Sequence, residues 1–331
     1  MKRLIKHFLP CLLSAALIFS LVGCTKPPAG ESLEAFGTYF DTIISIKIWG
    51  GDEKMLDHCK EMCSRYEQLF SRTIETSDIS RINAAKGKPV EVDNETIELI
   101  EKGLYYSQLS NGSFDITIAP LSELWDIKNN PGNIPDAASI EEAKSHVDYR
   151  NVQVEENTVT LKDPDAAIDL GGIAKGFIAD KLKVYLKSEG IEHGQIDLGG
   201  NLLTIGSKTD GSDFHIGIQK PFAETNEAIT TVDIHDQSVV SSGTYERYFK
   251  KDGKIYHHLL DPKTGYPYDN GLLQVTIISD QSVDGDGLST ACFALGLEKG
   301  TELIESLDHV QAIFVTDDYN LHYAGLNPAP Q

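Results

Sequence analysis

Residues 168–180 read IDLGGIAKGFIAD, an apolar strand end that runs through Gly171 and Gly172 directly into a helix. The turn between them offers free backbone N–H groups and the positive end of a helix dipole, which suit an anionic group or a phosphate. Lys175 adds a mobile positive charge in the first helical turn. Asp169 places a carboxylate before the turn, where it can orient a ligand. Taken alone, the same pattern also describes an ordinary strand-to-helix connection.

A second stretch of unusual polar content lies upstream, at residues 112–125, GSFDITIAPLSELW. Its Gly-Ser-Phe-Asp turn follows a predicted helix and offers backbone donors, an aromatic face and a carboxylate in a row. Gly, Ser and Asp are also the usual turn formers. The alternative interpretation is therefore a helix C-cap that leads to a connector with a core tryptophan, Trp125.

The third stretch is residues 241–265, SSGTYERYFKKDGKIYHHLLDPKTG. Its Asp-Gly pair between alternating segments predicts a hairpin, with paired strands over 245–249 and 255–260. His257 and His258 are consecutive in the second strand and point to opposite faces. We therefore expect only one of them to face a site on a given side.

The fourth stretch, residues 283–296, reads VDGDGLSTACFALG and runs into a helix. Asp286 and Thr290 are four residues apart, so both side-chain oxygens lie on one helical face. A carboxylate and a hydroxyl near a helix N-terminus can bind a hard cation such as Mg²⁺, which needs few protein ligands. The alternative is that Asp286 only caps the helix and interacts favourably with its dipole.

The remaining pattern alternates between helical and strand periods, which predicts a chain of both helices and strands. Strands are expected at 36–49, 193–205 (two, around Gly199-Gly200-Asn201), 214–219, 229–235, 238–241, 310–316 and 319–323, with a hairpin over 152–161. Helices are expected at 52–70, 94–112, 140–147 with Ser139 as its cap, 173–190 and 301–307. The polar turn at 77–80, which begins with Ser77, can cap a further short helix.

The N-terminus carries a targeting signal. Lys2, Arg3 and Lys6 precede the apolar run 8–22, which predicts a signal peptide over residues 1–23 that is too short for a lasting membrane span. The following Leu-Val-Gly-Cys resembles the lipobox of bacterial lipoproteins, in which the cysteine, here Cys24, is acylated after cleavage.

A plain secretory signal cut near residue 23 or 29 is the alternative to a lipobox. Residues 24–33 are expected to form a lipid-anchored flexible tether, and residues 34–331 a single large domain. The mature protein would then be extracytoplasmic and lipid-anchored to the cell membrane.

The charge restricts the possible partners. The net charge is −21, and removal of the signal's three basic residues makes it −24. Such a chain lacks the basic footprint that nucleic-acid binding requires. It would also not adhere to anionic lipid by charge, so only the lipid anchor would hold it at the membrane. An anionic substrate needs a local positive group such as Lys175 or a bound cation.

Three cysteines remain in the predicted domain: Cys59, Cys63 and Cys292. An odd number gives no disulfide framework, and side chains four apart on a helix rarely reach disulfide geometry. We expect all three to be buried apolar residues, with a bridge between Cys59 and Cys63 as the open alternative.

Five segments in this order resemble the ApbE family, flavin transferases that attach FMN from FAD to a threonine or serine of a protein. They are GSFDITIAPLSELW, DLGGIAKGFIAD, SSGTYERYF, HHLLDPKTG and DGDGLSTACFALG, and the likeness extends from FGTYFD at 36–41 to the end of the chain. The resemblance implies one α+β domain of mixed sheets and packed helices, related to the T-fold. It also implies FAD as the substrate, Mg²⁺ as the cofactor and AMP as the second product.

The resemblance implies specific roles as well. The metal ligands would be Asp286, Thr290 and the backbone carbonyl of Gly172, and His258 would be the base that takes the proton of the acceptor hydroxyl. The residues expected to contact FAD are Phe36, Thr73, Ser113, Phe114, Asp115, Asp169, Lys175 and, through its backbone, Leu259.

Two alternatives remain beside transfer of FMN. In the family, the side chain at the position of Thr73 biases the protein between transfer and hydrolysis of FAD to FMN and AMP, and threonine matches neither pattern. A Mg²⁺-dependent FAD pyrophosphatase is therefore one alternative, and a non-catalytic flavin-binding lipoprotein is the other. The predicted location points to a membrane-associated redox protein as the acceptor.

Overall fold

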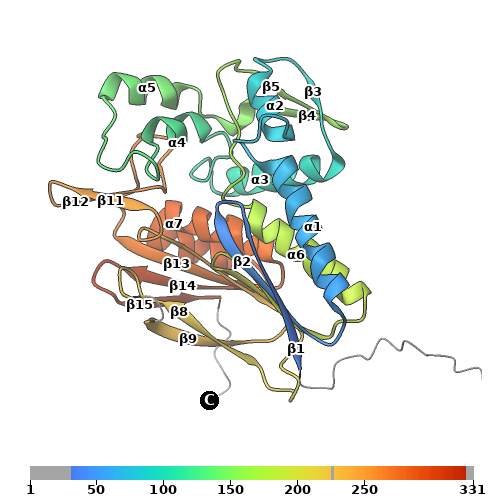
Figure 1. The fold of residues 1–331 in the computed structure, drawn as a ribbon. Coiled ribbons are helices and arrows are strands. Elements are labelled where there is room, and N and C mark those ends of the chain that lie inside the picture. Colours follow the sequence, from blue (N-terminus) through green and yellow to red (C-terminus); the bar gives the residue numbers. More distant parts are fainter. Residues whose placement is uncertain (1–30, 225–226, 326–331) are drawn as a thin grey trace, which may run out of the picture.

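The computed structural model describes residues 31–224 and 227–325. Its centre is an eight-stranded sheet in the order β1-β2-β6-β7-β10-β13-β14-β15, in which every neighbouring pair is antiparallel (Figure 1). The strands are β1 Ser32–Tyr39, β2 Thr42–Trp49, β6 His193–Leu198, β7 Asn201–Ile205, β10 Ser238–Gly243, β13 Leu272–Ser279, β14 Val310–Thr316 and β15 Leu321–Ala324.

Helices cover one face of this sheet (Figure 1). They are α1 Glu53–Phe70, α6 Ala174–Ser188 and α7 Ser282–Glu305, and α3 Asn94–Leu109 packs on α7. The hairpin of β8 Phe214–Gln219 and β9 Ala228–Ile234 packs on the opposite face, where Phe214, Ile218 and Ile234 form an apolar cluster with side chains of the sheet. The prediction of an α+β fold is confirmed.

The alternation at 36–49 produces a hairpin and not the single strand we expected. β1 and β2 are joined at Phe40 and Asp41, whose φ angles are 53° and 61°. Two consecutive positive φ angles characterise the tight turns of β-hairpins. In β2 the residues Ile44, Ile46 and Ile48 are buried against the helices, which fixes the register of the sheet.

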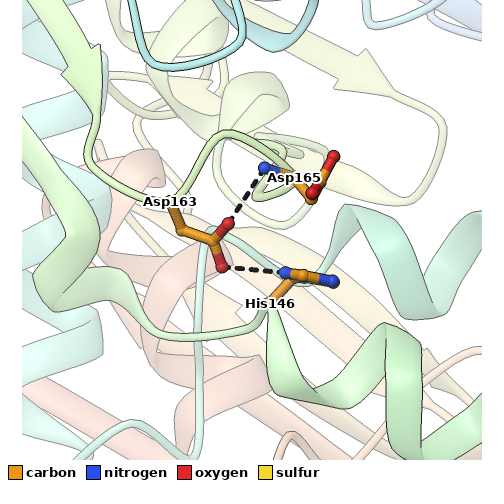
Figure 2. A group of neighbouring side chains, drawn as sticks. All are labelled: His146, Asp163 and Asp165. Carbon is orange, nitrogen blue, oxygen red and sulfur yellow. Dashed lines mark hydrogen bonds and ion pairs between the residues drawn. The ribbon is translucent and has the colours of Figure 1, made fainter.

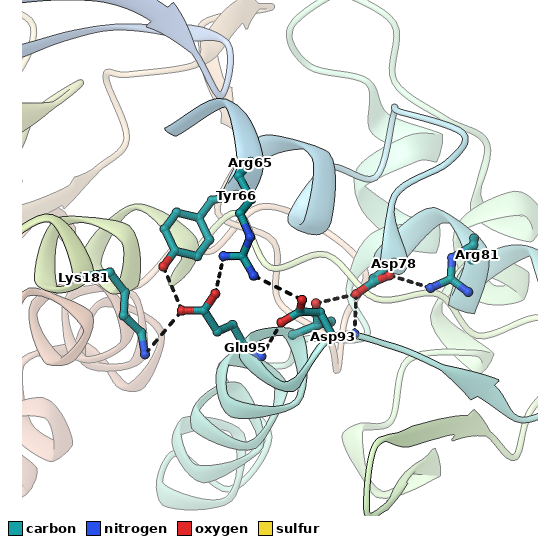
Figure 3. Close-up of polar contacts among 8 residues, drawn as sticks. Arg65, Tyr66, Asp78, Arg81, Asp93, Glu95 and Lys181 are labelled. Carbon is teal, nitrogen blue, oxygen red and sulfur yellow. Dashed lines mark hydrogen bonds and ion pairs between the residues drawn. The ribbon is translucent and has the colours of Figure 1, made fainter. Parts of the chain in front are cut away.

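Buried polar contacts hold the short helix α2 against α3. The short helix α2 Asp78–Ala84 begins at Ser77, whose side chain accepts from the backbone N–H of Ser80 as predicted. The buried carboxylate of Asp78 accepts from Thr96 Oγ1 at 2.7 Å and from the backbone N–H of Asp93 at 2.9 Å (Figure 3). This network ties α2 to the start of α3.

A second group of contacts in the same region joins α1, α3 and α6. Arg65 contacts both Asp93 and Glu95, while Lys181 Nζ lies 3.7 Å from Glu95 Oε1 (Figure 3). Tyr66 donates from its hydroxyl to the same carboxylate at 2.8 Å. These contacts set the position of α6, whose first turn carries Lys175.

Small elements complete the fold above the sheet. The helices are α4 Ala119–Trp125 and α5 Ala137–Ser145, and the strands are β3 Val90–Glu91, β4 Val152–Glu155, β5 Thr158–Leu161, β11 Tyr248–Lys251 and β12 Lys254–His257. The predicted cap of α5 was wrong: Asp136, and not Ser139, accepts from the backbone N–H groups of Ala138 and Ser139.

Several predictions concern the termini and the cysteines. The predicted signal peptide and Cys24 lie outside the described residues, whereas Ser32 and Leu33, assigned to the tether, already belong to β1. Among the helices that the structure describes, none is long and apolar enough to cross a bilayer. Cys59, Cys63 and Cys292 are free and buried, as expected.

Candidate functional site

A cavity of about 940 Å³ lies where the helix N-termini meet the end of the sheet. Segments that are far apart in the chain line it: the β1–β2 turn, the loop after α1, the turn before α6, the loop after β12, and α7. It is large enough for a dinucleotide-sized ligand, since ligand pockets usually span about 300–1,000 Å³.

The turn before α6 forms one wall of the cavity. The expected strand end is reduced to a single parallel bridge between Ile118 and Ala167, and the chain then turns at Gly171 and Gly172. The N–H of Gly171 donates to Asp169 Oδ1 at 2.8 Å. A Cβ at position 172 would lie 3.0 Å from the ring of Phe114, so glycine allows this close approach.

The same glycine lies beside α7. A Cβ on Gly172 would be 4.0 Å from Thr290 Oγ1, which places the backbone of the turn next to that hydroxyl. Thr290 Oγ1 also lies 3.0 Å from Ser242 Oγ on β10. The structure therefore brings Gly172 and Thr290 together, as the predicted cation site requires.

The N-termini of α6 and α7 are in direct contact. The backbone N–H of Gly176 donates to Asp286 Oδ2 at 2.6 Å. Asp180, one turn further along α6, accepts from the N–H groups of Ser282 at 2.8 Å and Val283 at 2.9 Å, and thereby caps α7. Asp286 and Thr290 thus face the cavity from a helix end that α6 holds in place.

The residues at this point fit a hard cation. Asp286 is 5% exposed, and burial raises the pKa of its carboxyl, while the nearby positive charge of Lys175 opposes this effect. Within the described chain no basic side chain forms an ion pair with it. Gly176 engages only one of its oxygens, so the other and the Thr290 hydroxyl, next to the backbone of Gly172, offer oxygen donors of the kind that Mg²⁺ prefers.

A different cluster could also be taken for a metal site. His146, Asp163 and Asp165 offer ligand atoms within 4.8 Å of one another (Figure 2). Asp163, however, already accepts from the backbone N–H of Asp165 at 2.9 Å and contacts His146 Nδ1 at 2.8 Å. None of the three lines the cavity. His146 and Asp163 form an ion pair that connects the end of α5 to the loop after β5.

The two histidines have different environments, but not because they alternate in one strand: β12 ends at His257, and the predicted strand over 255–260 was too long. His257 is 3% exposed, donates from Nε2 to the carbonyl of Tyr268 at 2.9 Å, and accepts from the N–H of Leu259 on Nδ1 at 3.3 Å. Burial lowers its pKa to about 4. These bonds fix one tautomer of a neutral ring inside the protein, which is a structural role.

His258 lines the cavity. Its Nδ1 is buried and makes no hydrogen bond to any described residue. Burial, with the positive charge of Arg247 as the next cause, lowers the pKa of His258 to about 3. The ring is therefore neutral at neutral pH and can accept a proton from a group bound in the cavity.

Comparison with known proteins decides the family. Residues 40–314 match the model of the ApbE family. The chain belongs to the ApbE family. It is 40% identical to the FAD:protein FMN transferase of Klebsiella pneumoniae over 281 residues, which cover 84% of this chain and 87% of that protein. It is 33% identical to the FAD:protein FMN transferase of Treponema pallidum over 279 residues, covering 80% of this chain and 77% of that protein.

Solved ApbE structures share the fold. The ApbE protein of Thermotoga maritima superposes with a TM-score of 0.82 at 31% identity, over 89% of this chain and 97% of that one. The flavin transferase ApbE of Vibrio cholerae gives a TM-score of 0.80 at 25% identity, over 89% of this chain and 97% of that one.

Most residues that the ApbE resemblance assigned to FAD lie around the cavity. Those that line it are Thr73, Ser113, Phe114, Asp115, Asp169, Lys175 and Leu259. Phe36 does not: it lies on β1 with 64% of its side chain exposed, while Phe40, at the turn of the same hairpin, is at the cavity wall.

Asp115 also has a local structural role. Its Oδ1 accepts from the backbone N–H of Thr117 at 2.8 Å and from the Thr117 hydroxyl at 2.6 Å. Its Oδ2 accepts from the backbone N–H of Tyr149 at 2.9 Å. The carboxylate thus holds the 113–117 loop in shape and joins it to the segment before β4.

Sequence reasoning missed two residues, Arg72 and Glu67, that hold other parts of the cavity wall in place. Arg72 Nε lies 3.1 Å from Asp169 Oδ2, and its Nη1 lies 3.2 Å from Glu123 Oε1. Glu67 Oε1 accepts from the backbone N–H of Phe40 at 2.7 Å and holds the hairpin turn at the cavity. Neither contact could be found from spacing, because the partners are distant in the chain.

Proposed function

We propose that this protein transfers FMN from FAD to a threonine or serine hydroxyl of an acceptor protein and releases AMP. The names of its curated relatives support the reaction class. The observation that carries the proposal is that one cavity joins the Gly171-Gly172 turn, the Asp286–Thr290 pair and the neutral ring of His258. A pyrophosphate, a cation and a hydroxyl nucleophile can therefore meet at one point.

The proposed step exchanges the phosphoanhydride bond of FAD for a phosphoester bond to the acceptor. The acceptor oxygen attacks the phosphorus that becomes part of FMN, the bond from that phosphorus to the bridging oxygen breaks, and AMP leaves with the bridging oxygen. His258 takes the proton of the attacking hydroxyl. The side-chain charge of Lys175 stabilises negative charge on the phosphate oxygens. The N–H groups of Ala174 and Gly176 are already bonded to Leu170 and Asp286.

The proposed cofactor is Mg²⁺, held by Asp286, Thr290 and the carbonyl of Gly172. When bound, it would neutralise the charge that develops on the phosphate oxygens. Gly176 orients the Asp286 carboxylate through its backbone N–H. Asp169 would hold a polar edge of FAD. The ion pair with Arg72 fixes the carboxylate of Asp169.

The test is a direct assay for the flavinylated product. Purified protein is incubated with FAD, Mg²⁺ and candidate acceptors, AMP is measured, and the acceptors are weighed by mass spectrometry. We expect AMP release together with an acceptor that gains the mass of FMN. AMP and free FMN without a labelled acceptor would favour the pyrophosphatase, which the threonine at position 73 leaves as the second candidate. Retention of FAD without AMP would favour a flavin-binding lipoprotein.

We further propose that the protein works outside the cytoplasm, anchored through acylated Cys24 after removal of residues 1–23, and that its acceptor is a membrane-associated redox protein. The lipobox-like sequence and the net charge of −21, which disfavours adsorption to anionic lipid, support the anchor. Labelling of cells with a palmitate analogue should mark the wild type but not a Cys24→Ser variant. Equal labelling of both would refute the anchor.

A further inference from the structure

Asn201 is a buried amide directly behind the proposed cation site. It is the first residue of β7, follows the Gly199-Gly200 turn, and has no exposed surface. It does not line the cavity, although both of its chain neighbours do. Its Oδ1 accepts a 2.6 Å hydrogen bond from the hydroxyl of Ser282.

This hydrogen bond fixes the orientation of the amide. Ser282 is the first residue of α7, and Ser238 on β10 lies 2.8 Å from it, hydroxyl to hydroxyl. The hydroxyl of Ser238 also lies 3.0 Å from the carbonyl of Leu202 on β7. Contacts among α7, β10 and β7 therefore keep Oδ1 of Asn201 directed at Ser282. The Nδ2 atom of the same amide must then point away from Ser282.

On that other side stands Asp286. The side chain of Asn201 is in contact with this carboxylate. Nevertheless Nδ2 makes no hydrogen bond of normal geometry to any described residue. A buried N–H group without an acceptor is costly, and natural proteins rarely keep one without a reason.

We propose that Asn201 is a positioning residue of the cation site, whose Nδ2–H donates to the Asp286 carboxylate and fixes its plane when the site is loaded. Gly176 holds the same carboxylate from α6, so the two donors together leave one oxygen direction for the cation. Groups that orient a metal-binding side chain commonly change metal affinity by about 10–100-fold. The inference rests on the proposed function, since it assigns Asn201 a part in the cation site.

The experiment measures cation affinity without measuring activity. Mn²⁺ is titrated into metal-free protein in the presence of FAD and the absence of acceptor, and free Mn²⁺ is followed by electron paramagnetic resonance. The variant Asn201→Leu keeps the approximate shape of the side chain and removes the donor. We expect its Mn²⁺ affinity to fall about tenfold or more, with FAD affinity in the absence of metal unchanged.

Gln274→Leu is the matched control. Gln274 is also fully buried and also has one amide atom without a partner, Oε1, but it does not line the cavity. Its replacement should change stability and leave Mn²⁺ affinity within twofold of the wild type. If Asn201→Leu does not fold, Ser282→Ala takes its place, because it releases the amide while leaving Asp286 intact, and a several-fold loss is expected.

The possible outcomes separate this inference from the proposed function. Mn²⁺ affinity within twofold of the wild type in Asn201→Leu, or in Ser282→Ala where that variant is used, overturns the role of Asn201 alone. Equal losses in Asn201→Leu and Gln274→Leu also overturn it, because the effect is then a general consequence of instability. Wild-type Mn²⁺ binding that survives Asp286→Ala overturns the cation site itself.

Discussion

The backbone N–H of Gly176 donates a 2.6 Å hydrogen bond to the carboxylate of Asp286, 110 residues away in the chain. This bond joins the first turn of α6 to the second turn of α7. Contact at this distance requires a residue without a side chain, because a Cβ at position 176 would overlap the carbonyl oxygen of Ser282.

Gly176→Ala is expected to separate the two helices and to impair both stability and cation binding. Overpacking of a close contact costs about 1–3 kcal/mol, although alanine favours the helix itself. Urea unfolding and Mn²⁺ titration would measure the two effects. Val184→Ala, at a position of α6 that is 67% exposed, is the control and should stay within about 0.5 kcal/mol of the wild type. An unfolding free energy for Gly176→Ala equal to the wild type would show that the contact can relax.

Replacement of His258 by glycine should abolish transfer and preserve binding of FAD. Loss of a positioned general base reduces the rate by about 10²–10⁴-fold. Single-turnover labelling of an acceptor and fluorescence titration of FAD measure the two properties. His322→Ala, which changes an exposed histidine on β15, should transfer at the wild-type rate. A His258→Gly variant that transfers normally would remove this ring from the reaction.

Removal of metal should stop transfer, and restoration of Mg²⁺ should recover it. EDTA-treated protein is expected to release no AMP, and Asp286→Ala is expected to recover only in part at high Mg²⁺, because the main charged ligand is gone. Asp163→Ala disrupts the cluster drawn in Figure 2 and should leave the Mg²⁺ dependence of AMP release unchanged. Full activity of Asp286→Ala in EDTA would contradict the metal assignment.

Stability should fall in acid because of His257. The pKa of this ring is about 4 in the folded protein and 6.5 when unperturbed. Below pH 6.5 the unfolded chain therefore binds a proton that the folded protein does not. The free energy of unfolding should decrease by up to about 3 kcal/mol as the pH decreases to 4. Above pH 6.5 this contribution is constant.

Asp180 has the opposite dependence, so the measurement must compare two proteins. Burial raises the pKa of Asp180 to about 6, and its contribution to stability decreases as the pH rises from 3.8 through 6. Urea unfolding of the wild type and of His257→Gln at pH 7.5, 6.0 and 4.5 isolates the histidine. The difference in free energy between the two should shrink toward low pH. A constant difference would mean that His257 titrates normally.

Local sequence patterns predicted the features whose causes are local. Asp286 and Thr290 share a helical face because they are four residues apart, and Ser77 caps α2 because its hydroxyl reaches the N–H of Ser80 three residues on. The family resemblance added His258, which residue spacing alone could not distinguish from His257. Here the structure supplied the distinction, through the contacts of His257 with Tyr268 and Leu259.

The errors arose where distant contacts decide the geometry. The β1–β2 turn places Phe40 and Asp41 at positive φ without glycine, so no turn signal interrupted the alternation and the hairpin was read as one strand. Phe36 was assigned to the site by the family resemblance alone. Asn201 was read as part of a turn, because its partners Ser282 and Asp286 lie more than 80 residues away. Its only sequence signal was a pair of glycines before a buried strand.

The strand order has a consequence for biosynthesis. β2 pairs with β6, which begins at His193, so until that residue has been made the edge that carries Ile44, Ile46 and Ile48 has no neighbour beyond β1. Unpaired apolar edges recruit other chains. A nascent or prematurely terminated polypeptide ending before residue 193 is therefore expected to aggregate unless a chaperone shields it, and because α7 follows later still, no such fragment can assemble the cavity.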